Sequence, residues 1–210
     1  MADPLRKRAV AATPSGKRAT YADLEAAPPE LVAEIIDGQL VTHRRPARAG
    51  IAATALGSLV THHFQKETGN WVFLPRPELH FGEHVLVPDC AGYHRGRLAG
   101  LEDVPHLEIV PEWVCEVLTP ETVRVDRTAK RRIYGEAGVG HLWLVDPRHQ
   151  LLEAFVLTDG RWALAGTWTG ADAAAAPPFE AISISLADLW PLDRPLGFAE
   201  NPQPLLAGDR

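Results

Sequence analysis

Two carboxylates occupy positions in the sequence where an ionised side chain is costly. Asp89 follows the apolar run 85–87 and Pro88, and Glu116 lies inside the apolar run 113–118. A buried carboxylate is destabilising unless a cation, a hydrogen-bond network or solvent reaches it. Mg²⁺ is such a cation, because it prefers oxygen ligands and is typically held by one or two carboxylates. Each acid could instead lie at a strand end and face water.

A lysine and a further acid follow Glu116 at helical spacing. Asp126, Lys130 and Tyr134 are separated by four residues each, which places them on one face of a helix predicted for residues 126–137. On the surface, Asp126 and Lys130 would form an ordinary ion pair worth about 0.3–0.5 kcal/mol. Beside a metal site, the Lys130 ammonium could stabilise the charge that develops at a phosphorus centre.

Neither the cysteines nor the histidines indicate a second kind of site. Cys90 follows Asp89 and Cys115 precedes Glu116, so on strands both thiols would face away from the acids. We expect two small buried core residues rather than nucleophiles. The histidines show no zinc-ligand spacing: two are adjacent and would diverge on a helix, and three lie in predicted strands and loops (His62, His63, His80, His84 and His94).

The elements that must position the acids follow from the hydrophobic pattern. Residues 113–118 and 141–145 are continuous apolar runs, typical of strands covered on both faces. The predicted helix 126–137 lies between them and ends at Gly138. This order of strand, helix and strand predicts a βαβ unit with a right-handed crossover.

Shorter patterns predict the remaining elements. Asp-Gly at 37–38 between apolar pairs indicates a hairpin, Thr20 a helix N-cap, and the spacing within 51–64 a helix. The segment 92–108 is expected to be a surface loop with a short helical turn. Strands are expected at 71–74, 79–81, 85–87, 151–157, 161–168 and 182–184, with a low-complexity linker at 173–178.

Length and composition limit the class of protein. The 210 residues suffice for one domain with its own core, and the formal charge of −6 argues against a protein that coats nucleic acid through bulk charge. No apolar stretch approaches the roughly 18 residues of a membrane span. Two cysteines favour the cytoplasm. We expect a basic flexible tail at 1–19, a domain at 20–190 and a Pro-rich tail at 191–210.

As a set, these motifs resemble the Uma-type restriction endonuclease family of bacteria, a branch of the PD-(D/E)XK nuclease superfamily. The resemblance runs in order from about Tyr21 to Trp190. It rests on residues 34–40, 87–89, 111–122, on Asp126, Lys130 and Tyr134, and on residues 137–147 and 177–179.

The resemblance implies an α/β fold of restriction-endonuclease type: a mixed sheet flanked by helices, with an N-terminal hairpin and additional antiparallel strands. It also implies an endonuclease that hydrolyses DNA phosphodiester bonds with Mg²⁺ or Mn²⁺. Asp89 and Glu116 would match the two metal-binding acids, and Glu34 a further acid beside the metal. The superfamily's usual lysine position is Leu118 here, and Lys130 would replace it, as in the family's own pattern. Asp126 would support Lys130.

The sequence departs from the family pattern at two positions that bear on rate and substrate fit. A histidine often found before the long helix is missing near Ala49, and Gln39 stands where an acid is common. Arginines beside the predicted site could contact the DNA backbone, or could simply form a solvated surface (Arg95, Arg97, Arg124, Arg127 and Arg131).

The sequence is also compatible with two functions other than DNA cleavage. One is a catalytically silent relative that binds nucleic acid or protein, and another is a hydrolase of a smaller phosphodiester. A homodimer is expected for an enzyme that cuts both strands, although nothing in the sequence identifies an interface.

Overall fold

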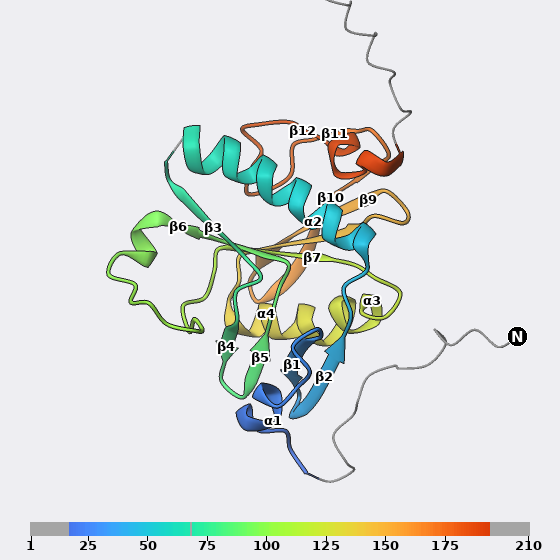
Figure 1. Cartoon of the computed structure of the whole chain (residues 1–210). Helices are drawn as coiled ribbons and strands as arrows, with labels where there is room; N and C mark the ends of the chain where they lie inside the picture. The colour runs from blue at the N-terminus through green and yellow to red at the C-terminus, as the bar shows by residue number, and fades with distance from the viewer. Residues whose placement is uncertain (1–16, 68, 194–210) are drawn as a thin grey trace, which may run out of the picture.

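A six-stranded mixed sheet forms the centre of the fold in the computed structural model, which describes residues 17–67 and 69–193 (Figure 1). Its strand order is β10-β9-β8-β7-β6-β3, and β7 and β8 are its parallel pair. The strands are β3 (Trp71–Pro75), β6 (Cys90–His94), β7 (Trp113–Val117), β8 (His141–Asp146), β9 (Leu151–Thr158) and β10 (Arg161–Thr169).

The predicted βαβ unit connects β7 to β8. The connection starts as α3 (Val123–Val125), widens into the π-helix η3 (Asp126–Lys130) and continues as α4 (Arg131–Ala137). Gly138 ends the helix with φ of 88°, a left-handed conformation that glycine adopts without steric strain. The predicted order of strand, helix and parallel strand is confirmed.

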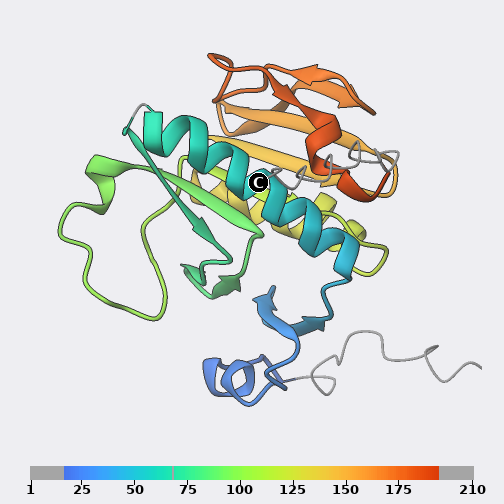
Figure 2. The same cartoon turned by 45° about the horizontal axis from the view of Figure 1, so that its top comes forward.

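Helices cover both faces of the central sheet (Figures 1 and 2). On one face, α2 (Ala47–Val60) and the π-helix η1 (Thr61–Glu67) pack over the strands, and Ala52 and Leu56 join the aromatic core there. On the other face, α4 contributes Ile133 and Tyr134 to a second core. Helix α2 begins four residues before the predicted start, because Pro46 can occupy the cap position with its fixed φ of −64°.

A second, antiparallel sheet carries the N-terminal hairpin. Its order is β2-β1-β5-β4, with β1 (Val32–Ile36), β2 (Gln39–His43), β4 (Leu79–Phe81) and β5 (His84–Leu86). The hairpin turns at Asp37 and Gly38, whose φ angles of 51° and 72° confirm the Asp-Gly prediction. Before it lies α1 (Tyr21–Glu25), where Thr20 accepts a hydrogen bond from the Asp23 amide as predicted.

The prediction of a loop over residues 92–108 is wrong at the start of that segment. Residues 90–94 form β6, which is buried between β3 and β7 and pairs with both. This strand contains small residues and so lacks a clear hydrophobic pattern. The packing requires a glycine at position 92, because a Cβ there would lie 3.0 Å from Phe73 and 3.1 Å from Trp113. The short helical turn is confirmed as the 3₁₀-helix η2 (Arg95–Leu98).

The C-terminal segment folds back over α2. The predicted linker 173–178 is wrong in part, because β11 (Ala173–Ala174) pairs with β12 (Ile184–Ser185) and Ala176 is buried. Two 3₁₀-helices follow, η4 (Leu186–Leu189) and η5 (Pro191–Asp193).

Most of the two expected tails lies outside the described residues. Within the described part, the Ala19 amide donates to Gly38 at 2.8 Å and Arg18 pairs with Glu83, so the residues before α1 contact the hairpin sheet. None of the described helices combines the length and apolar character needed to cross a membrane.

Candidate active site

Lys130 lies at the centre of a buried cluster of carboxylates. Its side chain is among the least exposed in the described residues, with the residue 1% accessible. The Nζ atom is 2.7 Å from Glu34 Oε1, 2.8 Å from Glu116 Oε1 and 3.8 Å from Asp126 Oδ1. The alternative of an exposed Asp126–Lys130 ion pair is therefore wrong.

Three elements bring these groups together. Glu34 comes from β1, where its Oε1 also accepts a hydrogen bond from the Val87 amide at 2.8 Å. Glu116 comes from β7, and Lys130 from the π-helix that follows it. One turn further along the helix, Tyr134 donates from its hydroxyl to Glu116 Oε1 at 2.5 Å.

Asp89 reaches the same site from the start of β6. Its Oδ2 accepts a hydrogen bond from the Val117 amide at 2.6 Å, and its Oδ1 is ion-paired with Arg45. Asp89 and Glu116 line one small pocket, so the structure brings together the two acids that are distant in the sequence. The pocket is lined by His43, Arg44, Arg45, Ala49, Val87, Asp89, Glu116, Val117, Thr119, Thr122, Asp126 and Lys130.

The two cysteines face away from this pocket. Cys90 and Cys115 are cross-strand neighbours with free, buried thiols. Both belong to the aromatic core under α2. The prediction that they are core residues is confirmed.

Electrostatics hold Lys130 and Glu34 as an ionised pair. Burial alone would lower the pKa of Lys130, but the charges of Glu116 and Glu34 raise it above its ordinary value. Burial also opposes ionisation of Glu34, yet the charge of Lys130 and the nearby His43 imidazole lower the pKa of Glu34 to about 2. Lys130 is therefore a permanent cation at this site.

Burial and mutual repulsion disfavour the ionised forms of the other two acids around Lys130. Burial raises the pKa of Asp126 to about 6, against the attraction of Lys130. Burial and the charges of Asp126 and Asp89 raise the pKa of Glu116 in the same way. Since Lys130 is already balanced by Glu34, these acids lack sufficient positive charge nearby.

The donor set fits a divalent cation. Four carboxylates and two permanent cations meet here, so two negative charges remain unbalanced when every acid is ionised. Hard oxygen ligands are the ligands that Mg²⁺ and Mn²⁺ prefer. Asp89 and Glu116 are the two acids that both line the pocket and come from neighbouring strands, so they are the residues best placed to hold it.

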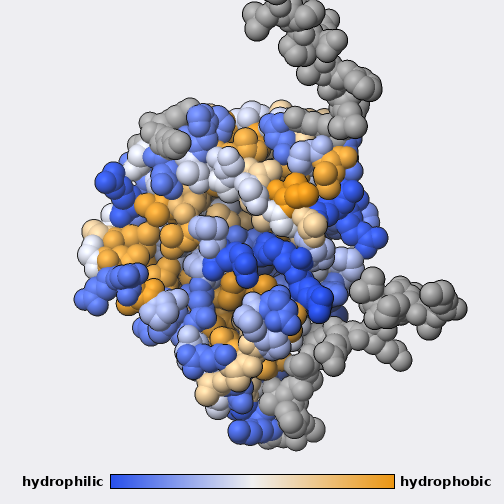
Figure 3. Space-filling model, in the orientation of Figure 1, coloured by the Kyte–Doolittle hydropathy of each residue, from blue (hydrophilic) through white to orange (hydrophobic). Residues whose placement is uncertain are grey.

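Sequence reasoning missed the basic side of the pocket. His43, Arg44 and Arg45 form the connection from β2 to α2, and His43 Nε2 lies 3.8 Å from Glu34 Oε2. The available signal was the basic run directly after the hairpin. In Figure 3, a hydrophilic band crosses the middle of the molecular face at the level of this connection, between two more hydrophobic areas.

Three of the five arginines expected near DNA are held by contacts within the protein. Arg97 pairs with Glu112 at 2.9 Å, Arg127 pairs with Glu153, and Arg131 lies over the ring of Phe155. The other two, Arg95 and Arg124, are exposed.

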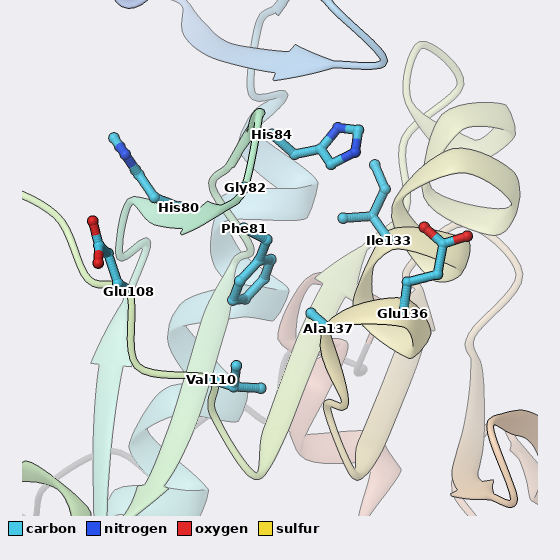
Figure 4. Close-up of a pocket in the computed structure, with 9 residues that line it drawn as sticks. All are labelled: His80, Phe81, Gly82, His84, Glu108, Val110, Ile133, Glu136 and Ala137. Atoms are coloured by element: carbon cyan, nitrogen blue, oxygen red, sulfur yellow. The ribbon is translucent and has the colours of Figure 1, made fainter.

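A larger pocket of about 620 Å³ lies between the β4–β5 hairpin and α4 (Figure 4). Its polar side chains do not converge: His80 and Glu108 lie on one side, and His84 and Glu136 on the other (Figure 4). The acid–lysine cluster is therefore the stronger candidate for chemistry, although its pocket is much smaller.

The structure resembles the crystal structure of a putative nuclease of the DUF820 family from Anabaena variabilis ATCC 29413, with a TM-score of 0.67 and 19% sequence identity over 80% of this chain and 94% of that chain. No curated protein matches the chain. Residues 18–187 match the Uma2 family, described as "Putative restriction endonuclease". The chain therefore belongs to the Uma2 family.

Proposed function

We propose that this protein is a metal-dependent endonuclease that hydrolyses phosphodiester bonds in DNA. The observation that carries the proposal is the convergence of Asp89, Glu116 and Lys130 on one pocket from three separate segments. Membership of the Uma2 family supports the same reaction class.

Asp89 and Glu116 would hold Mg²⁺ or Mn²⁺ at the pocket. When bound, the ion supplies an activated water and offsets charge on the phosphate oxygens. The Val117 amide fixes Asp89 and the Tyr134 hydroxyl fixes Glu116, so both carboxylates are oriented before an ion arrives.

Lys130 would stabilise the negative charge that develops on the phosphate in the transition state. Its ammonium is held by Glu34 on one side and Glu116 on the other. A fixed cation in a pocket with little solvent is more effective than one in water, because no solvent screens it and none must reorganise. Glu34 and Asp126 would act as positioning residues for Lys130.

Arg45 would contact the DNA backbone next to the reacting phosphate. Its guanidinium is half-buried in the pocket and paired with Asp89. A divalent ion on Asp89 would compete with that ion pair, which would leave the guanidinium able to bind a phosphate oxygen bidentately. Exposed Arg95 and Arg124 are the remaining candidates for backbone contacts.

The test is cleavage of supercoiled plasmid DNA with Mg²⁺ or Mn²⁺. We expect Asp89→Asn, Glu116→Gln and Lys130→Met each to lower the rate by about a hundredfold or more, because each removes a charge aimed at the reacting phosphate. The matched control is Glu121→Gln, an exposed acid that follows β7 and lies outside the pocket. Its rate should equal that of the wild type.

In a preparation free of contaminating nuclease, nicking by the three site variants at the wild-type rate would refute the site. Calorimetry with Mn²⁺ tests the binding step separately, since Asp89→Asn should lose the ion that the wild type binds. A wild type that binds DNA but neither binds Mn²⁺ nor cuts would instead be a silent member of the family.

A further inference from the structure

We propose that Glu78, His80 and His106 form a second metal site, for a transition metal of the Zn²⁺ class, at the edge of the large pocket, which His80 also lines. One potential ligand atom from each residue lies within 4.8 Å of the other two. None of the three residues lines the acidic pocket. Spacing in the sequence gave no sign of this group, because His106 is far from the other two along the chain.

The backbone fixes the three residues next to one another. Leu79 and Leu107 form a parallel bridge: the His80 amide donates to Leu107 at 2.9 Å, and the Leu107 amide donates to Glu78 at 2.8 Å. Leu79 and Leu107 are both buried in the core. Since side chains alternate along extended backbone, their neighbours Glu78, His80 and His106 project together from the other side. Figure 4 shows His80 pointing away from Phe81, as this alternation requires.

The side chains already contact one another. His80 Nε2 lies 2.8 Å from Glu78 Oε1, and the imidazoles of His80 and His106 stack with centroids 3.9 Å apart. His106 Nδ1 is buried without a hydrogen-bond partner among the described residues. An unsatisfied buried polar atom costs about 1–3 kcal/mol, and coordination of a metal through Nδ1 would satisfy this atom.

The donor set selects the kind of metal. Two imidazoles and one carboxylate are typical ligands of Zn²⁺, and three protein ligands leave a fourth position for water. Bonds of about 2.0–2.2 Å place tetrahedral ligand atoms roughly 3.3–3.6 Å apart, so the His80–Glu78 contact at 2.8 Å would open and the three side chains would rotate to converge on the ion. All three residues are half-buried, which leaves room for this rotation. Mg²⁺ prefers oxygen ligands, so the two sites would take different metals.

Tyr21 supports the site from α1. Its hydroxyl donates to Glu78 Oε1 at 2.9 Å, and its ring meets the imidazoles of His80 and His106 edge-on. A bound metal would therefore join α1, β4 and the connection that contains His106. The metal would link these segments, and its fourth position would stay open to water or a small ligand.

Cobalt substitution tests the proposal, because Co²⁺ at a four-coordinate site with histidine ligands absorbs strongly in the visible range. We expect the wild type to give this band and Zn²⁺ to abolish it by competition. His80→Gln and His106→Gln should each lose the band and weaken Zn²⁺ binding by about tenfold or more, and Tyr21→Phe should weaken it by about tenfold. The matched control is His149→Gln, because His149 pairs with Asp146 at 2.8 Å but is not part of the cluster.

Two outcomes would overturn the proposal. One is a wild type that binds Co²⁺ and Zn²⁺ no better than His80→Gln, which would leave only a hydrogen-bonded histidine–glutamate pair. The other is a cobalt band that survives in His106→Gln but disappears in Glu116→Gln, which would place the metal in the acidic pocket. DNA cleavage is not a readout here, so failure of this proposal leaves the proposed nuclease site untouched.

Discussion

At strand β7, the two faces of the central sheet bury different kinds of side chain. On the α2 face, Trp113 and Cys115 pack among aromatic rings, and Phe179 contacts both Trp113 and Trp143. On the opposite face, Glu116 meets a lysine and three further acids. One strand thus carries apolar packing that stabilises the fold and, one residue away, carboxylates whose charges oppose folding. This contrast supports the proposal that the acids serve binding and chemistry rather than stability.

The largest effect on stability is expected on the apolar face. Phe179 is 1% exposed and its ring contacts five other aromatic rings. Phe179→Ala should lower the free energy of unfolding by about 3–5 kcal/mol, through lost burial and the cavity left behind. Urea denaturation measures this, with Leu164→Ala as the control because Leu164 is 56% exposed. Equal losses in the two variants would contradict the described packing.

Asp126→Asn should raise the free energy of unfolding, and the gain should depend on pH. The pKa of Asp126 is raised from 3.8 to about 6, so the folded protein favours the protonated carboxyl. The stability that this preference gives is fully present below about pH 3.8 and is lost as the pH rises through 6. Asparagine cannot ionise, so at pH 8 in chelator the variant should be more stable than the wild type by on the order of 2 kcal/mol.

The control for Asp126→Asn is to compare the stability of variant and wild type at about pH 3.5, where the variant's gain in stability should disappear. A difference between variant and wild type that is constant from pH 3.5 to 8 would contradict the raised pKa. Addition of Mn²⁺ should stabilise the wild type more than the variant, since the ion offsets the charge that only the wild type carries.

The smallest effect is expected from Tyr134→Phe. The substitution removes the hydroxyl that donates to Glu116 Oε1 and keeps the buried ring. Lys130 still binds the same oxygen, so the loss of stability should be only about 0.5–1.5 kcal/mol. Thermal unfolding in chelator measures it. A loss as large as that of Phe179→Ala would mean that the polar face stabilises the fold as strongly as the apolar face does.

Much of the fold was predictable because its signals are local. Asp37 and Gly38 tolerate positive φ and so specify the hairpin, and Gly138 ends α4 for the same reason. The apolar runs of β7 and β8 identify strands covered on both faces. Strand β6 could not be found in this way, since its small residues are selected by the aromatic rings of other strands.

The sequence by itself determined which residues could do chemistry: an acid after one apolar strand, an acid inside another, and a lysine on the following helix. These follow from the cost of a charge in an apolar segment and from helical spacing. Only the tertiary structure decided that Glu34 binds Lys130, that Arg45 lines the pocket and pairs with Asp89, and that His106 joins Glu78 and His80. Such contacts join segments far apart in the chain, and the pairing of strands rather than any local pattern sets their distances.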